Sequence, residues 1–549
     1  MSQDLDEAMP GTGDRGRRTP SAVDLFGDWD DSIDSGHEPG ARYLRALPAE
    51  PPGPGSQYRF EVDLDRCSGC KACVSACHSL NGLDPGETWR SVGLVIGGGT
   101  DDAPVWQQHV TTACHHCLEP ACLAGCPVDA YEKDPVTGIV AHLDDQCIGC
   151  RYCMLTCPYE VPSFNQRLGV VRKCDMCTGR LSAGEAPACV QGCPTEAISI
   201  GVVSTAELAA LLAVDVDERV APTAPRSALT SPTTVYLTKK PVPAQVTAAD
   251  DHRVVPATNH PPLVAMLVLT QVSVGVVALG VVMSLSTDWF GSTGRLGAGP
   301  ALVAWITTVV AIAASVLHLG RPAMAWRALL GLGHSWLSRE ILAFGVYGGL
   351  GALTAVAAIA SLPAQVSVVA GLATSVAGLV GVFCSAQLYA VTGRAFWRLD
   401  RTLARFVVTM TVTGATLLTA VASVVVRMHA VEWQLAPMRR AAVVLVLVGV
   451  SAGMAASASH RRRHTGRGGE LGRSESLLAG PLRSSRIVAV ALAVGSCLTA
   501  VLSLLFDATS AASTAAWVLA AAAAIAASWA ERRLFFVAVA PDRMPGGLQ

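Results

Sequence analysis

Sixteen of the chain's 18 cysteines lie between residues 67 and 193 and fall into four groups of four. The first and third groups share the spacing C-x2-C-x2-C-x3-C, the second has four residues in its middle gap, and the fourth has eleven. A proline follows the last cysteine of every group except the first, where His78 stands. The region is therefore an internal repeat. Its groups are Cys67, Cys70, Cys73 and Cys77; Cys114, Cys117, Cys122 and Cys126; Cys147, Cys150, Cys153 and Cys157; and Cys174, Cys177, Cys189 and Cys193.

This spacing is typical of ligands for cubane iron–sulfur clusters. A tight loop supplies three thiolates to one cluster, and the fourth cysteine of each group usually binds the other cluster of a pair. Sixteen thiolates thus predict four [4Fe-4S] clusters in a domain that folds around them. Structural zinc and disulfides are the alternatives, because both also use cysteine pairs, but four quartets with the same rhythm disfavour them. We interpret His115 and His116, beside Cys114, as loop side chains that are solvated or that bond to the ligands rather than to the metal.

The composition changes sharply near residue 260. From there the chain has eight apolar stretches, each long enough at about 1.5 Å per residue to cross a hydrocarbon layer of about 30 Å. They predict a polytopic membrane domain, with five tryptophans placed as interfacial anchors would be. The stretches lie near 262–285, 301–320, 341–362, 366–391, 406–426, 441–459, 487–506 and 511–530, and the tryptophans are Trp289, Trp326, Trp336, Trp397 and Trp433.

The predicted fold class is α+β: a double bacterial-ferredoxin-like [4Fe-4S] domain fused to an all-α eight-helix transmembrane bundle. We expect the cluster domain over residues 57–200 and the membrane domain over 262–535. Residues 1–56 are rich in Asp, Gly and Pro and predict a disordered acidic tail. Residues 201–261 are rich in Pro and Thr and predict a linker with few helix or strand signals, and residues 536–549 a C-terminal tail.

The predicted spans have no Asp, Glu, Lys or Arg in their interiors, which disfavours a transporter or proton pump. A bis-histidine haem would need two histidines at matching depth. All histidines of the membrane half except His318 lie in predicted loops, so we expect no haem. Cys384 and Cys497 lie in apolar stretches and are interpreted as small hydrophobic residues.

His318 lies in "ASVLHLGRP", at the end of the second apolar stretch. The chain has crossed the membrane twice by then, so this segment lies on the side of the cysteine-rich domain. A quinol must release two protons and two electrons, which requires a titratable group near a cluster. The sequence therefore indicates a quinol site made of His318, Arg321, Arg339 and Glu340. The alternative for His318 is an interfacial histidine bonded to a backbone carbonyl.

Several motifs resemble one known family. "CIGCRYCMLTCPY" and "KCDMC" resemble the iron–sulfur electron-transfer subunit of dimethyl sulfoxide reductase-type molybdoenzymes, and "LHLGRP" and "SWLSREI" resemble their eight-helix membrane anchor. The resemblance covers roughly residues 57 to 540 and implies that two usually separate chains are fused here. It also implies a haem-free anchor that oxidises menaquinol at His318, and a separate catalytic molybdopterin subunit in anaerobic-type respiration or reductive metabolism. Nothing in this chain resembles a substrate-reducing centre.

The resemblance further implies that the first cysteine group pairs with the fourth and the second with the third. On that pairing the clusters have the following ligands: Cys67, Cys70, Cys73 and Cys193 (cluster 1); Cys77, Cys174, Cys177 and Cys189 (cluster 2); Cys114, Cys117, Cys122 and Cys157 (cluster 3); and Cys126, Cys147, Cys150 and Cys153 (cluster 4).

Charge predicts the orientation in the cytoplasmic membrane. Loops on the side of the cysteine-rich domain hold 17 arginines and the opposite loops hold four, which places the clusters in the cytoplasm. The N-terminus has no apolar signal segment, so we expect no export. Known members of the family export their iron–sulfur subunits, and this chain is expected to differ.

These observations predict a membrane-bound subunit that takes electrons from the quinone pool and passes them to the molybdopterin partner. Electron flow in reverse, from a substrate-oxidising partner into quinone, would use the same parts, because direction depends on cluster potentials. A redox-sensing membrane protein is a second alternative, but the chain has neither a missing ligand nor a signalling domain. The lipid bilayer is the other expected partner, and no nucleic acid is expected.

Overall fold

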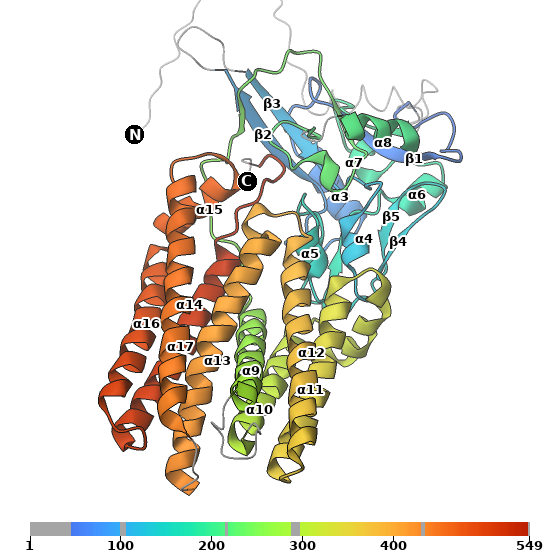
Figure 1. Cartoon of the computed structure of the whole chain (residues 1–549). Helices are drawn as coiled ribbons and strands as arrows, with labels where there is room; N and C mark the ends of the chain where they lie inside the picture. The colour runs from blue at the N-terminus through green and yellow to red at the C-terminus, as the bar shows by residue number, and fades with distance from the viewer. Residues whose placement is uncertain (1–44, 99–105, 215–217, 287–296, 430–433, 547–549) are drawn as a thin grey trace, which may run out of the picture.

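The computed structural model places the cysteine-rich region at one end of a long helical bundle (Figure 1). It describes residues 45–98, 106–214, 218–286, 297–429 and 434–546. Most of the predicted acidic tail, residues 1–44, lies outside the described residues. The described residues confirm the α+β class and contain eight helices that are long and apolar enough to cross a membrane.

Two three-stranded sheets and two strand pairs form the β-structure of the cysteine-rich domain. The strands in the described residues are β1 (Ser56–Asp63), β2 (Ser91–Gly97), β3 (Trp106–Thr112), β4 (Tyr131–Lys133), β5 (Val140–His142), β6 (Ser163–Asn165), β7 (Val170–Arg172), β8 (Ile198–Ser204), β9 (Val235–Leu237) and β10 (Val246–Ala248). β1 pairs antiparallel with β8 and parallel with β9, and β2 pairs antiparallel with β3 and β10. β4 pairs with β5 and β6 with β7.

Short helices lie within or beside each cysteine group. Lys71 and Arg151 precede two of these helices with φ of 62°, so the chain turns sharply between the second and third cysteines of their groups. This turn lets three cysteines face one space. The helices are α3 (Ala72–Leu80), α4 (Ala121–Gly125), α5 (Tyr152–Thr156), α6 (Thr178–Ser182) and α7 (Ala188–Gln191), and α8 (Thr205–Val214) follows β8.

The predicted linker and C-terminal tail have more structure than the sequence indicates. Residues 201–261 contribute α8, β9 and β10, and the two strands complete both three-stranded sheets. Near the C-terminus, the backbone N–H of Leu94 donates to the carbonyl of Gly546 (2.9 Å), and Met544 is buried against the cysteine-rich domain. Such short strands depend on backbone pairing with distant segments, which leaves little local pattern.

The membrane half is a bundle of eight long helices, most of them longer than the apolar stretches that predicted them. They are α9 (Pro261–Ser286), α10 (Ala298–Val316), α11 (Trp336–Ile359), α12 (Ala364–Ala390), α13 (Leu399–His429), α14 (Leu435–His464), α16 (Arg483–Leu502) and α17 (Ala511–Val537). The 3-10 segment η2 (Pro322–Gly333) precedes α11, and the short α15 (Gly469–Ala479) precedes α16.

One consequence of this extra length is a charged side chain inside the bundle. α17 continues past the predicted stretch and buries Arg532 completely. Its Nη2 donates to Gln271 Oε1 (2.9 Å) and Thr409 Oγ1 (3.2 Å), and the guanidinium lies over the ring of Phe406. The predicted stretch 511–530 itself has no charged residue, and Arg532 is buried because α17 extends beyond that stretch.

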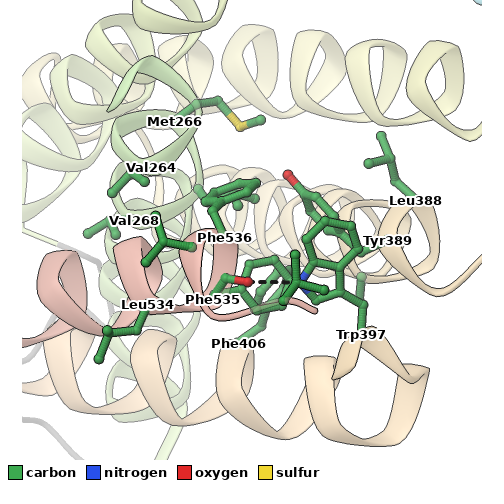
Figure 2. Packing of buried hydrophobic residues seen from close by; sticks show 14 of the residues in the cluster. Val264, Met266, Val268, Leu388, Tyr389, Trp397, Phe406, Leu534, Phe535 and Phe536 are labelled. Atoms are coloured by element: carbon green, nitrogen blue, oxygen red, sulfur yellow. Dashed lines mark hydrogen bonds between the residues drawn. The ribbon is translucent and has the colours of Figure 1, made fainter. Parts of the chain in front are cut away.

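An aromatic cluster joins α12, α13 and α17 (Figure 2). Trp397 stacks on Phe535, donates from Nε1 to the Phe535 carbonyl (2.9 Å), and packs with Tyr389 and Phe536. Trp397 is only 1% exposed, so it is a core residue rather than the predicted interfacial anchor.

Of the other predicted tryptophan anchors, Trp326 is 64% exposed, as an interfacial anchor requires. Trp289 and Trp433 lie outside the described residues.

The third cysteine group contacts the bundle through a close backbone approach. The N–H groups of Gly320 and Arg321 donate to the carbonyls of Gly149 (3.3 Å) and Ile148 (3.0 Å). A Cβ on Gly320 would collide with the carbonyl of Gly169. Beside this contact, the Tyr152 hydroxyl donates to the Leu388 carbonyl (2.7 Å) inside the bundle.

Substitution Gly320→Ala is expected to loosen this contact, because overpacking typically costs about 1–3 kcal/mol. Amide hydrogen exchange at residues 320 and 321 should accelerate by roughly ten- to a hundredfold, as for a local opening of that free energy. Gly333→Ala is the matched control, since a Cβ there meets nothing within 4 Å. Unchanged exchange in Gly320→Ala would show that a glycine at position 320 is not needed for the contact between the third cysteine group and the bundle.

Candidate functional site

The sixteen cysteines of the four groups gather as thiol quartets drawn from paired groups. Burial raises the pKa of the Cys67 thiol, and the neighbouring thiols of Cys73, Cys193 and Cys70 raise it further. Burial likewise raises the pKa of Cys77 to about 12, with Cys189 and Cys177 as its thiol neighbours. The first and fourth groups are thus interleaved. We call Cys67, Cys70, Cys73 and Cys193 quartet 1, and Cys77, Cys174, Cys177 and Cys189 quartet 2.

The second and third groups are interleaved in the same way. Burial raises the pKa of Cys117, and its thiol neighbours are Cys114, Cys157 and Cys122. Burial raises the pKa of Cys150 to about 12, with Cys126 and Cys147 beside it. We call Cys114, Cys117, Cys122 and Cys157 quartet 3, and Cys126, Cys147, Cys150 and Cys153 quartet 4.

The surroundings of the thiols fit an iron–sulfur cluster. All four cysteines of quartet 3 line one small cavity of about 20 Å³. Backbone N–H groups point at sulfurs elsewhere: Ala130 at Cys126 (3.3 Å) and Ala197 at Cys193 (3.2 Å). Such hydrogen bonds tune the potentials of bound clusters. Within the described part of the chain, no group of three or more His, Cys, Asp or Glu is placed to hold a single metal ion.

Two buried cations lie between neighbouring quartets. Arg90 is 2% exposed; burial alone would lower its pKa, but thiols from quartets 1 and 2 raise it above its ordinary value. Lys173 is 3% exposed, and thiols of quartets 2 and 3 likewise outweigh the effect of burial on its pKa. Its Nζ also donates to the carbonyls of Val140 and Cys174. Buried charges of this kind need opposite charges nearby, which ionised thiolates would supply.

A tyrosine connects the remaining pair of quartets. The pKa of Tyr131 is raised by burial and by the thiols of Cys153, Cys122 and Cys126, which belong to quartets 3 and 4. Arg90, Lys173 and Tyr131 therefore order the quartets as 1, 2, 3 and 4. Quartet 4 contains Cys150, which packs against the bundle core, while Cys70 of quartet 1 is exposed.

Three histidines lie among the quartets. His115 and His116 are 2% and 0% exposed, so of the two predicted environments the solvated one is wrong. His116 Nδ1 accepts from the Val140 N–H (3.0 Å), and His115 lines the quartet 3 cavity. His142 pairs with Asp144 (2.8 Å), and its bond to Cys147 helps lower the pKa of that thiol against the effect of burial.

His142 and the residues between the quartets were missed because they lie in strands or connecting loops. Their contacts with thiols join segments that are far apart in the sequence, and no local signal reveals them.

His318 lies next to the cysteine-rich domain. It follows α10, is 8% exposed, and meets the His260 ring edge-on with centroids 5.4 Å apart. Burial, His260 and Arg151 together lower the pKa of His318 to about 4, so the imidazole is neutral near pH 7. Arg151 directly follows Cys150 of quartet 4.

The three residues predicted to accompany His318 have other partners. Arg321 Nη1 donates to the carbonyls of Asp144 (2.6 Å) and Cys147 (3.4 Å), so it holds the loop that begins the third cysteine group. Arg339 donates to the carbonyls of Leu332 (3.1 Å) and Gly333 (2.8 Å) at the end of η2.

Glu340 is 3% exposed near the start of α11 and accepts from the Ser385 hydroxyl. Among the described residues, no hydrogen bond or ion pair joins Arg321, Arg339 or Glu340 to His318.

Comparison with known proteins covers both halves. Residues 105–203 match the family "4Fe-4S dicluster domain", and residues 257–537 match "DMSO reductase anchor subunit (DmsC)". The B subunit of the anaerobic dimethyl sulfoxide reductase of Escherichia coli (strain K12) is 40% identical over 154 residues, covering 27% of this chain and 75% of the relative. Its counterpart from Haemophilus influenzae is 35% identical with the same coverage. Hydrogenase-2 operon protein HybA of Escherichia coli O157:H7 is 34% identical over 194 residues, covering 30% of this chain and 59% of the relative.

Substitution Lys173→Met is expected to lower the reduction potential of the groups bound at quartets 2 and 3. A buried cation favours the reduced, more negative form; a charge interaction of about 2 kcal/mol, as at an effective dielectric of about 20, corresponds to roughly 50–100 mV for one electron. Redox titration followed by electron paramagnetic resonance measures the shift. Lys239→Met, at an exposed position, is the control. Equal potentials in both variants would show that Lys173 only supports the fold.

Proposed function

Because the chain belongs to the dimethyl sulfoxide reductase anchor subunit family and carries a cysteine-rich domain related to the B subunit of that enzyme, we propose that it oxidises menaquinol for a separate molybdopterin oxidoreductase. It is a membrane-anchored iron–sulfur electron-transfer subunit of a dimethyl sulfoxide reductase-type complex. The order of the thiol quartets carries the proposal, since it runs from a buried histidine at the bundle to an exposed cysteine at the other end.

Quartets 1 to 4 are the proposed ligand sets of four [4Fe-4S] clusters, which when bound would carry single electrons. The chain's own residues hold this path in place. Arg90 and Lys173 place positive charge between successive quartets, which stabilises added electrons. Tyr152 and the Gly149–Gly320 contact fix quartet 4 against the bundle.

His318 is the proposed proton acceptor for the quinol. A general base must be unprotonated at the working pH and within hydrogen-bond reach of the hydroxyl it deprotonates. The low pKa of His318 meets the first condition. For the second, no hydrogen bond from the described residues occupies its ring nitrogens. Arg151 connects this site to quartet 4 through its neighbour Cys150.

The partner is proposed to dock on the face that carries Cys70. This cysteine is the exposed member of quartet 1, farthest along the quartet order from His318. A catalytic subunit covering this face would shield the cluster and bring its own redox centre close.

Substitution His318→Ala is expected to abolish cluster reduction by a menaquinol analogue. We would purify the chain anaerobically, count about sixteen iron per chain as four cubanes require, and follow reduction by electron paramagnetic resonance. Dithionite should still reduce the variant, because it needs no quinol site. His252→Ala, at an exposed position, is the control. Full clusters that quinol never reduces in the wild type would favour reverse flow or sensing, and zinc in place of iron would overturn the proposal.

We also propose that the cysteine-rich domain faces the cytoplasm. Support comes from the arginine-rich end of α14, where Arg461, Arg462 and Arg463 lie on the side of that domain. Clusters of this kind favour the cytoplasmic side.

Sidedness predicts the labelling of single introduced cysteines. In intact cells, a membrane-impermeant maleimide should label Asp507→Cys, on the opposite side, but not Arg462→Cys; both positions are exposed. Permeabilised cells, in which both should react above the wild-type background, provide the control. Labelling of only Arg462→Cys in intact cells would place the clusters outside.

A further inference from the structure

We propose that His260 is a proton-relay residue that takes each quinol proton from His318 and passes it to water on the side of the cysteine-rich domain. The proposal rests on quinol oxidation at His318. It assigns a role to a histidine that the sequence places in a loop, far from His318 along the chain.

The geometry places the two imidazoles together at the boundary of the two domains. His260 directly precedes α9, and its carbonyl accepts from the Val264 N–H (3.0 Å) at the first turn of that helix. Its ring contacts His318 edge-on (5.4 Å between centroids) and Phe536 (5.7 Å). Imidazole rings in contact are close enough for a proton to pass between them directly or through water.

Exposure gives the relay its direction. His318 is buried, whereas His260 is only half-buried and thus lies closer to solvent. Within the described residues, no hydrogen bond occupies a ring nitrogen of His260, so these nitrogens are available to His318 and to water.

The positive charge of Arg151 disfavours a bound proton on either histidine, as burial does. Arg151 is itself held over the Phe164 ring, 3.7 Å from its centroid. A proton taken by His318 is therefore driven outward to the more exposed ring.

Protons and electrons balance in this transfer. Each quinol O–H bond breaks, its proton forms an N–H bond on His318, and this proton moves through His260 to water. Two such transfers convert the quinol to quinone. Both histidines return to their neutral form when the proton leaves to water, and the two electrons would pass singly to an iron–sulfur acceptor held by quartet 4.

The decisive variant is His260→Phe, which keeps a ring against His318 and Phe536 but cannot carry a proton. In the full chain with its clusters, stopped-flow reduction by a menaquinol analogue should slow about ten- to a hundredfold, within the range of positioned proton transfer. The quinol concentration for half-maximal rate should stay unchanged, and dithionite reduction should remain fast. His252→Phe is the matched control at an exposed histidine.

A second variant, His260→Ala, separates proton transfer from packing. Added imidazole should restore its rate, because the small base can occupy the space and carry protons. Failure of imidazole to restore the rate, together with a raised half-saturating quinol concentration, would make His260 a binding residue and overturn the relay.

His318→Ala distinguishes the two proposals. If it is slow while His260→Phe matches the wild type, the relay fails and quinol oxidation at His318 stands. If His318→Ala itself reduces at the wild-type rate, the proposed quinol site fails.

Discussion

The backbone contact between Gly149 and Gly320 fixes the relation between the two halves of the molecule. The segments approach so closely that a Cβ on Gly149 would lie 2.9 Å from the backbone of Gly320, and a Cβ on Gly320 would collide with the carbonyl of Gly169. Arg321 extends the contact by binding two carbonyls at the start of the third cysteine group. Cys150 and Tyr152 then pack on the bundle core. Because quartet 4 is built on this same loop, the end of the thiol path nearest the membrane is set by this backbone contact together with the side chains of Arg321 and Tyr152.

Electrostatics imposes the next constraint. Sixteen thiols in one small domain would repel one another when ionised, and burial makes that repulsion stronger because the dielectric is low. Arg90 and Lys173 occupy the interior positions where thiols of neighbouring quartets converge. Their side chains thus serve the fold, as counter-charges, and the proposed function, as stabilisers of electrons in transit. A neutral substitution affects both, which is why a potential is the informative readout.

The parts of this structure that follow local rules were visible in the sequence. Cysteine spacing identified the cluster domain, and apolar length identified all eight spans. The parts that depend on tertiary contact were not. β9 and β10 are three-residue strands recruited to distant edges, and Trp397 is buried because the end of α17 supplies an aromatic partner and a carbonyl.

Arg532 lies inside the bundle because α17 extends beyond its apolar stretch. Its hydrogen-bond partners are Gln271 and Thr409, from two other helices. The candidate quinol site likewise combines a residue found from local sequence with a residue found only from the fold. The sequence identified His318 because it lies at the end of an apolar stretch. It did not identify His260 as a neighbour, because only the fold brings the start of α9 beside the end of α10.

The position of the site also bears on energy conservation. His318, His260 and quartet 4 all lie at the end of the bundle that contacts the third cysteine group. Quinol oxidation there would release protons and electrons on the same side of the membrane. A partner docked over Cys70 would receive the electrons on that side as well. Electron transfer through this chain would then move no charge across the bilayer, and the eight helices would serve to hold the quinol site at a fixed depth beneath the clusters.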